Sequence, residues 1–108
     1  NKKLFPKRDY LHISDLLKLL LKIFAKLEKK KIKEIYNVGM GKNYSLNQIL
    51  NYYNNQIKKN LKINYQVIAS EELFSTLSDI SKTKKDFKWK PKMKINDIIK
   101  SSQSIKFE

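Results

Sequence analysis

The amino-acid sequence predicts an α/β fold with about four helices and a few short strands. Lysines recur at helical spacing within residues 15–29, and apolar residues repeat every three or four positions in 46–59 and 95–107. Shorter runs rich in β-branched and aromatic residues, 35–38 and 62–68, are typical of strands. We expect one domain or a piece of one, because 108 residues lie within the usual size of a domain.

The chain is expected to begin in an extended conformation. Pro6 lacks a backbone N–H and biases the residue before it away from helix. Residues 8–13 follow as a short strand or extended segment. Ser14 or Asp15 should then cap the first helix, because a short side-chain oxygen can accept a free amide hydrogen there.

The predicted helix over residues 15–29 is apolar around most of its circumference. Its polar face is a narrow stripe of lysines at positions 18, 22, 26 and 29. A helix of this kind must be covered on more than one side. We expect either a layer of protein that is absent from this chain or a second copy in a homodimer to cover it.

A glycine turn and a second helix follow the predicted strand at 35–38. Residues 39–41 should end that strand, and Ser45 with Gln48 forms a capping box. The amphipathic pattern runs to about Lys59. Asn60 is a suitable terminating residue in the left-handed conformation.

The last third of the chain predicts two more helices. Residues 71–77 are either one helical turn or a loop. Asp79 should cap a short helix that ends at Phe87, and residues 89–91 form a turn. The final helix is expected over residues 95–107.

The formal charge of +14 suggests a nucleic-acid-binding module, and this alternative stays open. Two observations weigh against it. Of the 24 basic residues, 23 are lysines, whereas nucleic-acid recognition favours arginine. The lysines are also spread over nearly every segment. A second alternative is a non-catalytic interaction module that uses the apolar face of the helix at 15–29.

Several kinds of site and location are excluded or expected from composition. No cysteine is present, which excludes disulfides and thiolate metal sites, and one histidine cannot build a metal site alone. There is no signal-peptide pattern. The longest apolar stretch has 12 residues and contains three lysines, too short for a membrane span of about 20 residues. We therefore expect a cytoplasmic chain with no membrane contact.

Arg8 is the residue best suited to bind an anion. Its planar guanidinium can hold phosphate oxygens through two parallel hydrogen bonds. The structural alternative is an ion pair with Asp9 or Asp15. His12 is expected to be a hydrogen-bonded packing residue, since a lone imidazole on an extended segment rarely acts as a base.

Four segments carry a resemblance to a known family: Arg8-Asp9-Tyr10, residues 34–39, residues 79–82 and residues 89–91. In this order and spacing they resemble the C-terminal portion of the extended short-chain dehydrogenase/reductases, the NAD-dependent nucleotide-sugar epimerases and dehydratases. The resemblance covers most of the chain. It implies that residues 1–108 form the substrate-binding region of such an enzyme, without its Rossmann half.

The resemblance also implies the ligand and its contacts. Arg8 would reach the diphosphate of a nucleotide sugar, and Tyr10, Asn37, Gly39 and Gly41 would belong to the same substrate-binding site. The family's catalytic Tyr-x-x-x-Lys occurs nowhere in this chain, so we expect no catalytic residue and no activity of its own. NAD or NADP would bind to the parent enzyme and no cofactor to this fragment. Because the chain begins at Asn1 without methionine, we expect it to be incomplete.

The expected partners are therefore the nucleotide-sugar substrate, the missing N-terminal Rossmann domain and, as an option, a second copy. The sequence departs from the family pattern in three places. Ala69 stands where many epimerases have a second phosphate-binding arginine, Glu71 replaces a glycine, and Lys88 replaces a glycine before the tryptophan. These departures suggest a divergent branch, a reductase or dehydratase rather than a 4-epimerase.

Overall fold

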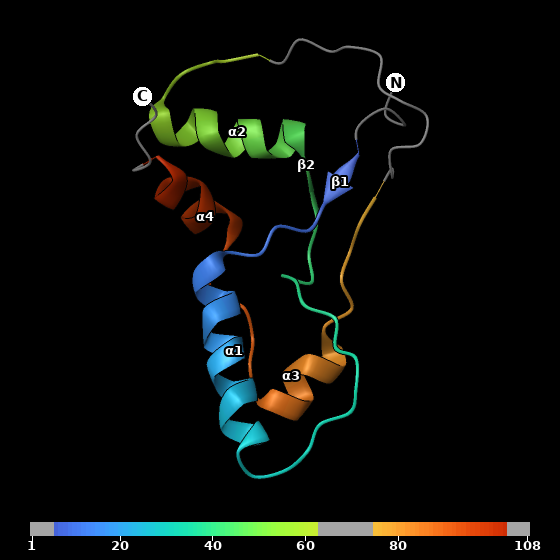
Figure 1. The fold of residues 1–108 in the computed structure, drawn as a ribbon. Coiled ribbons are helices and arrows are strands. Elements are labelled where there is room, and N and C mark those ends of the chain that lie inside the picture. Colours follow the sequence, from blue (N-terminus) through green and yellow to red (C-terminus); the bar gives the residue numbers. More distant parts are fainter. Residues whose placement is uncertain (1–5, 63–74, 104–108) are drawn as a thin grey trace, which may run out of the picture.

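The computed structural model describes residues 6–62 and 75–103. In this part of the chain the elements are β1 (Lys7–Arg8), α1 (Ile13–Leu27), β2 (Tyr44–Ser45), α2 (Leu46–Ile57), α3 (Ser81–Phe87) and α4 (Ile95–Ser102). Figure 1 shows α2 beside α4 at one end and α1 beside α3 at the other, with the two strands between them. The predicted class, four helices with short strands, is confirmed.

A small core joins α1 to α3 and the turn that follows it. Leu19 of α1 is fully buried and meets Phe87, the last residue of α3. Ile80 and Trp89 complete the cluster, and the indole ring is only 4% exposed. Burial of a large apolar side chain stabilises a fold by about 1.5–3 kcal/mol. This cluster therefore holds α1, α3 and the turn after α3 together.

The strands β1 and β2 form a minimal antiparallel sheet. Lys7 lies opposite Ser45, and Arg8 lies opposite Tyr44. The carbonyl oxygen of Lys7 also accepts a hydrogen bond from the Thr76 amide at 3.0 Å. Two different parts of the chain thus fix the position of the backbone just before and at Arg8.

The first helix begins two residues earlier than predicted, and its cap is neither Ser14 nor Asp15. His12 is the N-cap, and its ring nitrogen Nδ1 accepts the Ser14 amide hydrogen at 3.1 Å. An imidazole nitrogen here does the work of the usual short oxygen side chain. The helix ends at Leu27, so the predicted range 15–29 becomes 13–27.

The segment 35–38 forms no strand in the part of the chain that the structure describes, which corrects the prediction. Its carbonyl groups bond to side chains of α3 instead: Ile35 accepts from Lys82 Nζ at 3.3 Å, and Asn37 accepts from Thr83 Oγ1 at 2.6 Å. A β-branched and aromatic composition favours a strand only where a neighbouring strand is available to pair with it. Ile35 remains 90% exposed.

The later elements agree with the sequence more closely. The capping box of Ser45 and Gln48 is present, with bonds of 3.1 and 2.8 Å. The left-handed residue after α2 is Lys58, with φ of 56°, rather than Asn60. The Asp79 carboxylate does accept the Ser81 amide hydrogen at 3.1 Å, but Ile80 occupies the N-cap position of α3.

Three predictions lie wholly or partly outside the described residues. These are nearly all of the strand at 62–68, most of the segment 71–77 and the end of the last helix after residue 103. Within the described part, Ser75 pairs with Lys7 as an isolated parallel bridge. The last helix is described from Ile95 to Ser102.

One face of α1 is uncovered by the described residues. Its apolar side chains are exposed as follows: Ile13 60%, Leu17 53%, Leu21 68%, Phe24 57% and Leu27 46%. Their spacing places them on one side of the helix. The helix therefore packs through Leu19 on one side and leaves an apolar stripe bare, as its composition predicted.

Candidate functional site

The site is organised around Asp9, the residue between Arg8 and Tyr10. Its oxygen Oδ1 accepts the Met40 amide hydrogen at 2.7 Å, and Oδ2 accepts the Gly41 amide hydrogen at 2.9 Å. Oδ2 also receives the Ser78 amide at 3.3 Å. One half-buried carboxylate thus gathers three backbone donors from two distant segments. Sequence reasoning missed this role, because no side-chain partner marks it.

The two glycines of the turn serve this arrangement in different ways. A Cβ atom on the buried Gly39 would lie 2.7 Å from Ser78 Cβ and 3.0 Å from Asp9 Oδ2, so no side chain fits. Gly41 has φ of 82°, in the left-handed region that favours glycine. The glycines therefore allow the turn to press against Asp9.

Arg8 and Tyr10 flank Asp9 along an extended segment. Successive side chains of an extended chain point to opposite faces, which places Arg8 and Tyr10 on the face away from Asp9. Both are half-buried. The Arg8 guanidinium donates from Nη1 to the Lys7 carbonyl oxygen at 2.9 Å, besides a further contact. The two carboxylates that could pair with Arg8, Asp9 and Asp15, are each engaged by backbone amides.

Asn37, the remaining predicted site residue, takes no part in the clamp that Asp9 forms with the amides of Met40, Gly41 and Ser78. Its carbonyl accepts from Thr83, and its position is exposed. The amides of Met40 and Gly41 in the turn are held by the Asp9 carboxylate. The structure thus brings Gly39 and Gly41 against Asp9, whose neighbours in the chain are Arg8 and Tyr10, and ties Asn37 to α3.

The loop after the glycines lines a hollow of about 350 Å³. Tyr44 and Tyr52 meet edge to face there, with ring centroids 6.2 Å apart, and burial raises the pKa of Tyr44. The lining residues are Met40, Lys42, Tyr44, Tyr52, Pro91, Lys92, Met93, Lys94, Ile95 and Asn96. Met40 of the glycine turn and Lys42 just after it thus form part of the wall of this hollow.

A second aspartate clamp lies at the start of α1. Asp15 is 1% exposed; Oδ1 accepts from the Lys92 amide and Oδ2 from the Met93 amide, both at 3.0 Å. Its carbonyl accepts from the Trp89 indole Nε1, also at 3.0 Å. The predicted role of Asp15 as a helix cap is therefore wrong. The carboxylate anchors the turn that leads into α4.

His12 is a packing residue, as expected. Besides capping α1, its Nε2 lies 3.2 Å from the Ser101 hydroxyl of α4. Both ring nitrogens are thus engaged in bonds within the fold. This leaves the imidazole in a structural role that links the two ends of the molecule.

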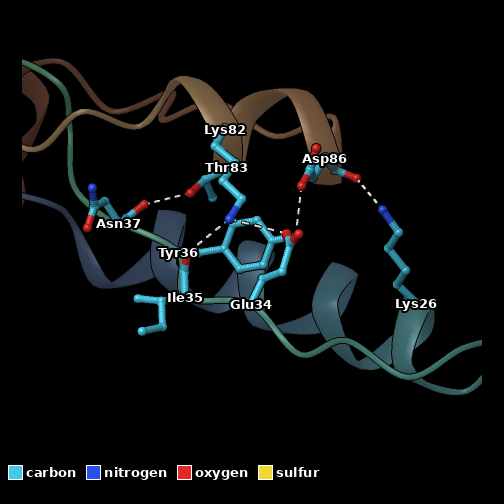
Figure 2. A network of polar contacts seen from close by, with 8 residues as sticks. All are labelled: Lys26, Glu34, Ile35, Tyr36, Asn37, Lys82, Thr83 and Asp86. Atoms are coloured by element: carbon cyan, nitrogen blue, oxygen red, sulfur yellow. Dashed lines mark hydrogen bonds and ion pairs between the residues drawn. The ribbon is translucent and has the colours of Figure 1, made fainter.

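A polar network ties the segment before the glycine turn to α3 (Figure 2). The Tyr36 hydroxyl lies 2.8 Å from Asp86 Oδ2 and 2.9 Å from Glu34 Oε2, and the hydrogen bond to Asp86 raises the pKa of Tyr36. Lys82 pairs with Glu34 at 3.2 Å, and the Tyr36 and Lys82 bonds lower the pKa of Glu34. Carboxylates on both sides keep the phenol protonated, so this tyrosine is unsuited to act as a base.

Within residues 6–62 and 75–103, no cluster of histidine, aspartate and glutamate could hold a metal ion. In the same ranges no helix is long and apolar enough to cross a bilayer. The group of this site that is chemically suited to hold an anion is the Arg8 guanidinium, next to Asp9 in the chain.

Comparison with known proteins identifies the class of this arrangement. No protein-family model matches the chain. The chain is 26% identical over 95 residues to UDP-glucose 4-epimerase of Bifidobacterium longum, covering 88% of this chain and 28% of the relative. It is 27% identical over 91 residues to dTDP-4-dehydro-6-deoxyglucose reductase of Escherichia coli, covering 84% of this chain and 28% of the relative.

A solved structure gives the same result at the level of the fold. The structure of the Bifidobacterium longum epimerase in complex with NAD⁺ and UDP superposes with a TM-score of 0.82 at 26% identity. The match covers 91% of this chain and 29% of that chain. This fold is that of the C-terminal part of the extended short-chain dehydrogenase/reductases. Within that class, the homologues are nucleotide-sugar epimerases and reductases, which confirms the resemblance seen in the sequence. The chain spans about 28% of the length of these two curated relatives.

Proposed function

We propose that residues 1–108 form the nucleotide-sugar-binding portion of an NAD(P)-dependent epimerase, dehydratase or reductase. The observation that carries this proposal is the placement of Arg8. Arg8 lies on a short strand pair, and Asp9, its neighbour in the chain, holds a glycine turn. The equivalent fold in the Bifidobacterium enzyme was solved with UDP and NAD⁺. Arg8 would bind the diphosphate, and Tyr10, Asn37, Gly39 and Gly41 would belong to the same site.

The rest of the enzyme would dock on the bare surfaces of this chain. The exposed apolar stripe of α1 and the unpaired segment 35–38 both favour such a partner. A missing Rossmann domain would cover them and bind NAD or NADP. A second copy is the other occupant that the stripe would accept. The cytoplasmic location expected from the sequence stays a prediction.

Without that domain the chain should bind ligand but turn nothing over. The supporting observation is that no tyrosine in the chain is followed four residues later by lysine. The test is incubation of the purified chain with UDP-glucose, dTDP-sugars and NAD(H) or NADP(H), followed by chromatography. Turnover of any sugar nucleotide would refute the absence of activity.

Binding is tested by calorimetric titration of the chain with UDP. Arg8→Lys should weaken binding by about tenfold, because an ammonium cannot reproduce the two parallel bonds of a guanidinium. The matched control is the exposed Lys59→Arg, which should bind UDP like the unchanged chain. Equal affinity of the Arg8→Lys variant would remove Arg8 from the site.

The charge of +14 favours one other function, a nucleic-acid-binding module. Such binding falls steeply as salt rises. A gel retardation assay at moderate salt separates the two proposals. Retention of an RNA or DNA duplex there, together with no affinity for UDP, would replace the first proposal by the second.

A further inference from the structure

The carboxylate of Asp9 links the proposed ligand-binding face to two segments far away in the sequence. Its two oxygens take the amide hydrogens of Met40, Gly41 and Ser78. The residues that share its segment, Arg8 and Tyr10, face the other way. The Asp9 side chain therefore lies on the opposite face of this segment from the side chain of Arg8.

Asp9 and the turn are packed so closely that a displacement of one would displace the other. Gly39 is buried, and its Cα lies so near Asp9 and Ser78 that no Cβ can be added without a displacement. The Ser78 hydroxyl in turn donates to the Val38 carbonyl at 3.3 Å. Movement of the Asp9 side chain would therefore move the turn, and the backbone of Arg8 with it.

We propose that Asp9 is the positioning residue of the diphosphate site, fixing the backbone of Arg8 and Tyr10 against the glycine turn. The inference rests on the proposed function. It adds a role for a residue whose carboxylate is bound to backbone amides and whose negative charge would by itself disfavour a nearby anion. Asp9 acts through Arg8, by holding the guanidinium at one place and orientation.

Charge and position predict opposite effects of neutralising Asp9, which makes the proposal testable. A carboxylate near an anion site repels a diphosphate, so its removal by Coulomb's law alone would tighten UDP binding. Asparagine, however, has only one acceptor oxygen and turns an NH₂ group toward a backbone donor. Asp9→Asn must therefore lose at least one of the three amide bonds and loosen the turn.

The experiment is calorimetric titration of the chain and of Asp9→Asn with UDP and, separately, with uridine. We expect Asp9→Asn to lose about tenfold in UDP affinity, because a misplaced contact weakens with small displacements. Uridine, which lacks the diphosphate, should change by less than about threefold. The matched control is Asp79→Asn, which removes the same charge from an exposed carboxylate whose bonds go to Ser81.

Each outcome decides the matter. If Asp9→Asn binds UDP as well as the unchanged chain or better, as Asp79→Asn should, Asp9 is no positioning residue. An equal loss for UDP and uridine would show a general structural defect and also overturn the proposal. Should Asp9→Asn fail to fold by circular dichroism, Asp9→Glu keeps the charge and displaces it by one methylene, and the same ratio of affinities is measured. If the unchanged chain binds no UDP, the proposed function fails first and this inference falls with it.

Discussion

At the scale of single residues, Asp9 and Asp15 do the same structural work six positions apart. Each carboxylate uses both oxygens to hold backbone amides of a distant loop. A hydrogen bond to a charged group contributes about 1.5–3 kcal/mol. Neither role was predictable from the sequence, because the partners are main-chain donors, which every residue except proline carries. The glycines at 39 and 41, in contrast, correctly predicted a turn.

Asp79 offers a test of local electrostatics. The hydrogen bonds from the Ser81 hydroxyl and amide lower the pKa of Asp79. The charged form is thus favoured in the folded state, so its contribution to stability is present above the unfolded pKa and is lost as pH falls through the lowered folded value. We expect Ser81→Ala to raise the pKa of Asp79 part of the way toward its ordinary value, because the amide bond remains.

The measurement is an NMR titration of the Asp79 carboxyl carbon in the unchanged chain and in Ser81→Ala. Ser102→Ala is the control, since that hydroxyl donates to the Ile99 carbonyl in α4. It should leave the Asp79 titration unchanged. An unchanged midpoint in Ser81→Ala would mean that the hydroxyl does not set it.

At the scale of elements, the helices were predictable, whereas the strand expected at residues 35–38 does not form in the described part of the chain. Helical spacing placed α1 and α2 within two residues of their observed ends, since each helix satisfies its own backbone. A strand depends on a neighbour, and residues 35–38 have none among the described residues. The segment that does pair, Lys7–Arg8, is only two residues long and gives no periodic signal.

The end of α3 predicts a stabilising change. Lys88 is held in the left-handed region with φ of 49°. A side chain costs on the order of 1 kcal/mol there, so Lys88→Gly should raise the free energy of unfolding by about that amount. Lys85→Gly, inside the same helix, should lower it by about 1 kcal/mol. Thermal unfolding followed by circular dichroism measures both, and a shift of the same sign in the two variants would contradict the expectation.

At the scale of the whole molecule, the described residues form a buried cluster and leave an apolar stripe of α1 uncovered. Among the described residues, the core meets α1 through the side that carries Leu19 and Ile23. The opposite stripe has no cover among the described residues, as the apolar circumference of the helix predicted. The sequence could indicate that cover was needed. It could not indicate which side would be bare, because leucines occupy both.

Two leucines of α1 separate these surfaces energetically. Leu19→Ala removes a fully buried side chain and should cost about 2–5 kcal/mol of stability. Leu21→Ala changes a side chain that is 68% exposed and should stay within about 0.5 kcal/mol. Urea unfolding of the isolated chain gives both values. A large loss for Leu21→Ala would show that the stripe is already covered, for instance by a second copy.

The indole of Trp89 has a practical consequence. It is the chain's single tryptophan, lies in the core and donates to the first turn of α1. Its fluorescence emission therefore comes from one known place, with no background from other indoles. Any event that pulls the first turn of α1 away from the Trp89 turn will shift that emission to longer wavelength. The fluorescence of Trp89 therefore reports on the contact between the first turn of α1 and the turn that follows α3.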